Sequence, residues 1–188
     1  MTLPNDILPS DAQTFEIENL ELQRGITLPR AELVYKTYGR LAADKSNVML
    51  YPTSYGAQHS DIEWLIGPGR VLDPTDWFIV IPNMFANGLS SSPSNLTPPF
   101  GGERYPAFTH WDNVHAQRRM LDEVFGVEHL ALVYGWSMGA QQALHWAAIF
   151  PDQVARICAI CGSARTSVHN KVFLEGVRAA LTADPNWR

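Results

Sequence analysis

The pentapeptide Gly135-Trp136-Ser137-Met138-Gly139 carries the clearest chemical signal in the sequence. It fits the pattern G-x-S-x-G, follows the apolar run at residues 130–134 and precedes an alanine-rich segment of helical composition at residues 140–150. In a tight turn between a strand and a helix, such a serine is held in a strained conformation with its hydroxyl exposed above the sheet edge. The flanking glycines let neighbouring backbone come close. The motif therefore predicts that Ser137 is the nucleophile of an acyl-transfer reaction.

Acyl transfer also requires donors for the negative oxygen that develops in the transition state. The Met138 N–H, at the predicted N-terminus of the helix, is the first expected donor. The second should come from the loop after the third predicted strand, Pro52-Thr53-Ser54-Tyr55-Gly56. The sequence leaves the backbone amides of Thr53 and Ser54 as alternatives for this role.

A serine hydroxyl also needs a general base, and around this motif the acid and the histidine follow the serine along the chain. Only His145 and His169 follow Ser137. His145 lies about two helical turns away and is expected to point off the site, and His169 has no plausible acid between it and the preceding strand. Neither is predicted to be the base. The earlier histidines are expected on loops or helix surfaces: His59, His110, His115 and His129.

The elements around the motif predict an α/β fold with a mostly parallel sheet flanked by helices. Two alternating segments, near residues 15–18 and 31–37, predict paired strands, with Arg24-Gly25 and Leu28-Pro29 as turn material. Four continuous apolar runs predict strands buried on both faces: 48–51, 77–81, 130–134 and 154–161. Helices are predicted from the capping box at Thr109 to Gly126, over 140–150 and over 168–181. The long segment 83–110 is expected near the site.

Composition excludes several classes of function. The 188 residues include 14 basic and 19 acidic side chains, for a net charge of −5 without any basic block, which argues against nucleic-acid binding. No apolar run is long enough to span a bilayer, and residues 1–13 lack a secretory pattern, so we expect no membrane association and a cytoplasmic location. Cys158 and Cys161 are expected to pack in the core rather than act in redox chemistry. His59, Asp61 and Glu63 complete no metal site, so neither a metal nor a cofactor is predicted.

Several segments together resemble the homoserine O-acetyltransferase family of α/β-hydrolase-fold enzymes. The resemblance covers nearly the whole chain from about residue 30. Its motifs, besides 135–139, are Asp76-Trp77-Phe78-Ile79-Val80-Ile81-Pro82-Asn83, Tyr105-Pro106, Asp112-Asn113-Val114-His115-Ala116-Gln117, Ser163-Ala164-Arg165 with Arg178, and Ala183-Asp184-Pro185-Asn186-Trp187.

The resemblance implies a Ser-His-Asp enzyme that works through an acyl-enzyme on Ser137, with Asn83 and Arg178 near the substrate pocket. It implies a single, C-terminally incomplete α/β-hydrolase domain over residues 1–188, in which 183–188 begin a helical lid. The acid and the histidine would follow, so this chain alone is expected to be inactive. The implied partners are a small-molecule ester or an acyl-CoA co-substrate with a hydroxyl acceptor, in methionine biosynthesis. Segment 154–161 is expected to form a bare edge strand that favours a homodimer or poor solubility.

Two departures from the family pattern leave the reaction open. Trp136 precedes the serine and Ala140 follows Gly139, where glycines are usual in the family, and the segment 84–93 replaces a glycine-rich one. A bulky indole beside the nucleophile favours an ester hydrolase, or an acyltransferase with another acceptor. The alternative is a catalytically incomplete paralogue that acts as a binding or oligomerising module.

Overall fold

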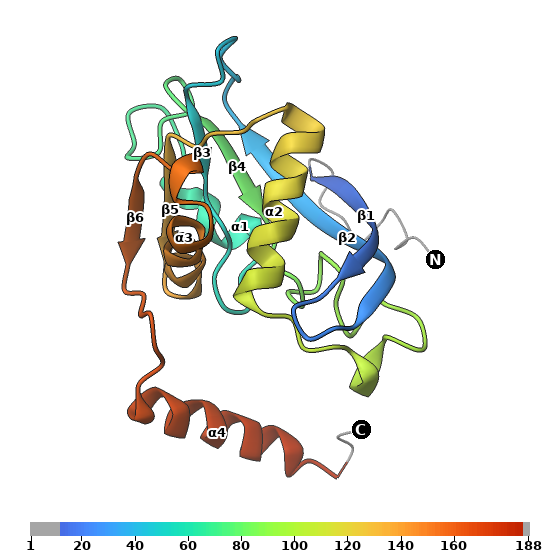
Figure 1. The fold of residues 1–188 in the computed structure, drawn as a ribbon. Coiled ribbons are helices and arrows are strands. Elements are labelled where there is room, and N and C mark those ends of the chain that lie inside the picture. The colour runs from blue at the N-terminus through green and yellow to red at the C-terminus, as the bar shows by residue number, and fades with distance from the viewer. Residues whose placement is uncertain (1–11, 186–188) are drawn as a thin grey trace.

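The computed structural model describes residues 12–185 of the protein. These residues form a single six-stranded sheet with helices packed against it. The strands lie in the order β1-β2-β4-β3-β5-β6 (Figure 1). Strands β3, β4, β5 and β6 run parallel to one another, while β2 is antiparallel to both β1 and β4. The predicted mostly parallel sheet is confirmed. The strands are β1 Gln13–Glu21, β2 Thr27–Tyr38, β3 Val48–Leu50, β4 Phe78–Pro82, β5 Leu132–Trp136 and β6 Ile157–Ile160.

One predicted turn is wrong. Leu28 and Pro29 lie inside β2, and the turn between β1 and β2 is made earlier, where the Leu22 N–H donates to the Ile26 carbonyl at 2.8 Å and Gly25 has a φ of 80°. Proline is tolerated here because β4 pairs with β2 only from Tyr35 onward, so the missing N–H removes no hydrogen bond to β4.

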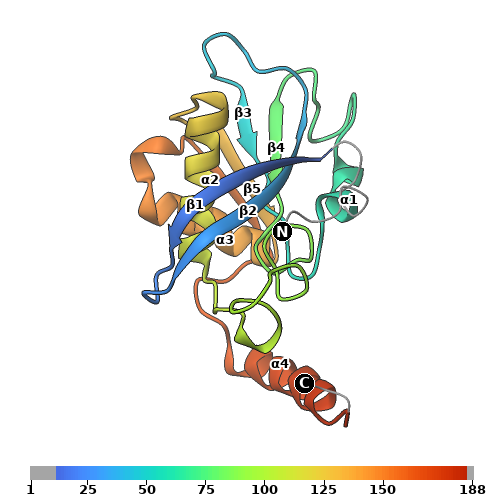
Figure 2. The ribbon, with the colours of Figure 1, turned by 90° about the vertical axis from the view of Figure 1, so that its right-hand side faces the viewer.

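Helices cover both faces of the sheet. Helices α2 (His110–Phe125) and α3 (Met138–Ile149) lie on one face, and the short α1 (His59–Ile62) lies on the other (Figure 2). Helix α2 begins as predicted, with a capping box in which the Thr109 side chain accepts from the Asp112 N–H. It ends at Gly126, whose φ of 60° and ψ of 33° are left-handed.

The core has two parts, one on each face of the sheet. In β4, Val80 belongs to the cluster beneath α2 and α3, whereas Ile79 and Ile81 belong to the cluster beneath α1. All residues of β3 and β4 are buried. The continuous apolar runs at 48–51 and 77–81 thus form strands buried on both faces, as their pattern predicts.

The C-terminal part of the described chain is far more exposed. Strand β6 is the sheet edge, as predicted, but the expectation that the run 154–161 is buried on both faces is wrong, since Ile157 and Ile160 are 36% and 43% exposed. Cys161, expected in the core, is exposed as well, because no further strand covers this edge among residues 12–185. Helix α4 (Val168–Thr182) lies apart from the sheet, and none of its residues is buried (Figure 1). The predicted lid start at 183–188 lies partly outside the described residues. None of the helices between residues 12 and 185 is long and apolar enough to cross a membrane.

Candidate active site

Ser137 occupies the sharp bend that the sequence predicts. Strand β5 ends at Trp136, helix α3 begins at Met138, and Ser137 between them has a φ of 54° and a ψ of −122°. A non-glycine residue in this region carries strain of about 1–3 kcal/mol, which persists only where the surroundings enforce it. The Ser137 backbone N–H donates to the Ile160 carbonyl of β6 at 2.9 Å, and its side chain makes no capping hydrogen bond. The Ser137 hydroxyl is thus not used to cap α3, and its role as the nucleophile stays a prediction.

The two motif glycines have distinct steric reasons. A Cβ on Gly135 would lie 2.3 Å from the Gly139 carbonyl oxygen, because the bend folds back on itself. A Cβ on Gly139 would lie 2.7 Å from the Pro52 carbonyl oxygen, because the start of α3 packs against the loop after β3. The second contact brings the two segments predicted to supply oxyanion donors side by side.

Free backbone amides are available in both segments. Met138 is the first residue of α3, so its N–H has no partner within the helix. The Thr53 N–H donates to the Pro82 carbonyl at 3.3 Å, whereas the Ser54 N–H has no hydrogen-bond partner among residues 12–185. Of the two alternatives left by the sequence, the structure therefore favours Ser54.

A cavity of about 860 Å³ reaches Met138 at the start of α3. Its wall comes from the loop after β3, from the long segment that follows β4 and from α3, so the segment 83–110 does contribute to it. Among residues 12–185, no Lys, Arg, Asp or Glu lines the cavity. No periodic pattern in the sequence predicts its aromatic and sulfur-containing wall, which includes Tyr55, Met84, Phe85, Tyr105, Phe108 and Trp111.

Two histidines lie in the same cavity wall, with ring centroids 5.2 Å apart. Burial lowers the pKa of His110, and its Nε2 lies 3.0 Å from Gln141 Oε1, so a neutral imidazole is favoured at neutral pH. His145, expected to point off the site, lines the cavity, and its Nδ1 lies 3.0 Å from the Gln141 carbonyl oxygen. Neither histidine is hydrogen-bonded to Ser137 in the described part of the chain.

His59 was expected at the surface, and that expectation is wrong. It is 1% exposed because the start of α1 is fastened to the core, where the His59 N–H donates to Asn83 Oδ1 at 3.0 Å. Asn83 is itself fully buried, and its Nδ2 donates to the Val34 carbonyl at 3.1 Å. Asn83 thus lies behind the cavity wall rather than in it.

Arg178, the second residue that the resemblance places near the substrate pocket, lies away from the cavity. Arg178 is on the exposed helix α4, 3.3 Å from Glu175, and does not line the cavity. A substrate role for Arg178 or Asn83 stays a prediction. No cluster of three or more His, Cys, Asp or Glu residues that could hold a metal ion occurs within residues 12–185.

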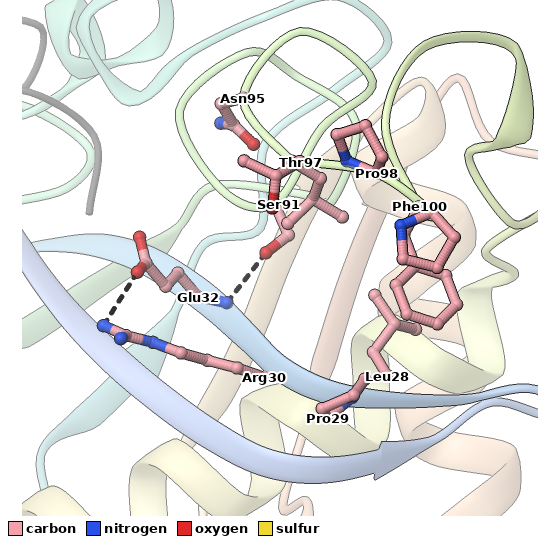
Figure 3. A pocket seen from close by; sticks show the side chains of 11 residues that line it. Leu28, Pro29, Arg30, Glu32, Ser91, Asn95, Thr97, Pro98 and Phe100 are labelled. Atoms are coloured by element: carbon pink, nitrogen blue, oxygen red, sulfur yellow. Dashed lines mark hydrogen bonds and ion pairs between the residues drawn. The ribbon is translucent and has the colours of Figure 1, made fainter. Parts of the chain in front are cut away.

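A smaller cavity of about 220 Å³ lies between β2 and the segment 91–100 (Figure 3). Arg30 in its wall is paired with Glu32 at 3.1 Å and with Glu16, and the Glu32 N–H donates to Ser91 Oγ at 2.8 Å. These contacts fasten the long segment to the sheet. None of the predicted site residues lines this cavity.

Comparison with known proteins places this geometry in a family. The family described as "alpha/beta hydrolase fold" matches residues 55–187. An ethyl acetate hydrolase of Pseudomonas veronii is 44% identical over 178 residues, which are 93% of this chain and 51% of that protein. The solved structure of the acetyl esterase MekB is 43% identical with a TM-score of 0.90, over 93% of this chain and 51% of that one. A homoserine O-acetyltransferase structure from Bacillus anthracis is 25% identical with a TM-score of 0.81, over 94% and 53%.

The chain belongs to the alpha/beta hydrolase fold family. The predicted fold class and the resemblance to homoserine O-acetyltransferases are both confirmed. The chain spans about half the length of the relatives it matches.

Proposed function

We propose that this chain supplies the nucleophile and the oxyanion hole of a serine esterase that acts on small, uncharged esters. The observation that carries the proposal is the strained conformation of Ser137 between β5 and α3, together with the Met138 and Ser54 amides, which have no hydrogen-bond partner within residues 12–185. Strain of this kind is typical of functional sites.

In the proposed reaction, a general base removes the proton of the Ser137 hydroxyl as Oγ bonds to the ester carbonyl carbon. The Met138 and Ser54 amides donate to the resulting oxyanion. When the oxyanion collapses, the ester C–O bond breaks, the alcohol leaves with the proton and the acyl group stays on Ser137. Water then releases the acid. No histidine among residues 12–185 is hydrogen-bonded to Ser137, so none of them is proposed as the base.

The cavity, whose wall within residues 12–185 includes Met138 but not Ser137 itself, favours hydrolysis of a neutral ester over transfer to homoserine. Homoserine carries an ammonium and a carboxylate group, and coenzyme A carries phosphates, so both call for charged partners. The part of the cavity wall that the structure describes contains no Lys, Arg, Asp or Glu, and the pKa of His110 is lowered by burial. The names of the similar proteins, an ethyl acetate hydrolase and an acetyl esterase, support the same substrate class.

The test uses the gene product that carries this sequence, expressed at its full encoded length. Turnover of ethyl acetate and p-nitrophenyl acetate is compared with acetyl transfer from acetyl-CoA to homoserine, in the wild type and in Ser137→Ala. Ser94→Ala, an exposed serine of the long segment, is the matched control. We expect ester hydrolysis that Ser137→Ala abolishes and Ser94→Ala preserves. Equal turnover by Ser137→Ala would refute the assignment of the nucleophile.

A second candidate is a binding or oligomerising module without turnover. The observation that favours it is the set of exposed apolar side chains on α4: Val168, Val172, Phe173, Leu174, Val177 and Leu181. In that case the full-length product would associate but would hydrolyse no ester above the Ser137→Ala background.

A further inference from the structure

A buried chain of side-chain amides connects the core to the oxyanion-hole loop. The Trp146 Nε1–H donates to Gln117 Oε1 at 2.8 Å, and Gln117 Nε2 donates to Gln142 Oε1 at 2.7 Å. Gln142 Nε2 in turn donates to the Thr53 carbonyl at 2.9 Å. All four residues are at most 1% exposed, so water does not compete for these hydrogen bonds.

Trp146 determines which end of each glutamine side chain donates and which accepts in this series of hydrogen bonds. An indole N–H can only donate, so the oxygen of Gln117 must face Trp146 and its NH₂ group must face Gln142. The oxygen of Gln142 then accepts, and its NH₂ group is left to donate to Thr53. Both glutamine orientations therefore follow from hydrogen-bond chemistry.

The last hydrogen bond acts on the peptide unit that carries the proposed oxyanion donor. The Thr53 carbonyl and the Ser54 N–H belong to the same planar, trans peptide bond, so they point in opposite directions. The Thr53 side chain is held as well, since its Oγ1 accepts from the Met84 N–H at 2.9 Å. A carbonyl held from the core side leaves the Ser54 N–H directed away from it, with no partner of its own among the described residues.

We propose that Gln142 is a positioning residue, which orients the Ser54 N–H of the oxyanion hole by holding the Thr53 carbonyl. The inference rests on the proposed function. Gln142 lies on α3, whose first residue Met138 supplies the other donor. Helix α3 thus orients both proposed donors: the Met138 N–H lies at its N-terminus, and the Ser54 N–H is oriented through the Gln142 side chain.

Two variants of the full-length protein test the proposal. Gln142→Leu removes the donor, and loss of one oriented oxyanion donor should lower kcat by about 10- to 100-fold with little change in KM, because the interaction is made in the transition state. In Gln142→Glu only the neutral acid can donate to the Thr53 carbonyl. Its kcat should therefore decline, relative to the wild type, as the pH rises and the carboxyl ionises. Leu130→Ala, a buried change two residues before the start of β5 and so at the end of that segment away from Ser137, controls for lost stability and should keep the wild-type kcat.

The outcomes separate the two claims. If Ser137→Ala is inactive while Gln142→Leu keeps the wild-type kcat, the positioning role is overturned and the proposed function stands. If Ser137→Ala stays active, the proposed function itself fails. A crystal structure of Gln142→Leu adds a readout without turnover, and a Thr53–Ser54 peptide unit in an unchanged orientation would overturn the positioning role as well.

Discussion

Replacing Gly135 with alanine tests the closed geometry of the bend directly. The new Cβ would lie 2.3 Å from the Gly139 carbonyl oxygen and 2.8 Å from the Ala140 backbone nitrogen. Both atoms belong to the backbone of the same bend, so no flexible side chain can move aside. Overpacking of this kind costs about 1–3 kcal/mol, and the rigid neighbours favour the upper end, about 3 kcal/mol. With a urea m-value of about 2 kcal/mol/M, the unfolding midpoint should fall by about 1.5 M.

The assay is urea unfolding followed by tryptophan fluorescence, to which the buried Trp146 contributes. Gly176→Ala is the matched control, because a Cβ at Gly176 meets nothing within 4 Å and no residue of α4 is buried. The control should leave the midpoint unchanged. Equal midpoints for Gly135→Ala and Gly176→Ala would refute the steric argument for the bend.

Three further changes have separable outcomes. Burial lowers the pKa of His110 from its ordinary value of 6.5, so just below pH 6.5 the unfolded chain binds a proton that the folded chain does not. The free energy of unfolding should therefore fall as the pH drops through that window. Urea midpoints measured at neutral and at mildly acidic pH should differ less in His110→Gln than in the wild type. Thr109→Ala removes the cap of α2 and should lower stability by about 1 kcal/mol in the same assay, whereas Ser167→Ala, at the cap of the unburied α4, should not. Ile160→Lys charges the exposed edge strand β6 and should reduce self-association of the 188-residue chain in sedimentation velocity, and unchanged association would argue against edge pairing.

The sequence predicted most of the sheet and the position of Ser137, because these depend on local patterns. The apolar runs, the capping box at Thr109 and the left-handed Gly126 each follow from a few neighbouring residues. The turn at Leu28-Pro29 was predicted wrongly because proline is read as a break. Whether a strand tolerates it depends on where β4 begins to pair with β2, which is a tertiary property.

The walls of the site could not be predicted in the same way. His59 is buried because its backbone N–H donates a hydrogen bond to Asn83, which belongs to a different segment. Hydrophobic periodicity cannot predict a contact between two distant polar residues. Gln142 was the exception that offered a signal, since it is a polar residue within the apolar stretch of α3. Its partner Thr53 is 89 residues away in the sequence, so only the fold identifies what it holds.

The central claim is that Ser137 carries the acyl group, and trapping that intermediate tests it most directly. The full-length product is mixed with p-nitrophenyl acetate, quenched in acid during turnover and digested for mass spectrometry. We predict one acetyl group on the peptide that contains Ser137, and none on the same peptide of Ser137→Ala. Turnover with the acetyl group on another residue, or with the same labelling in Ser137→Ala, would contradict the account.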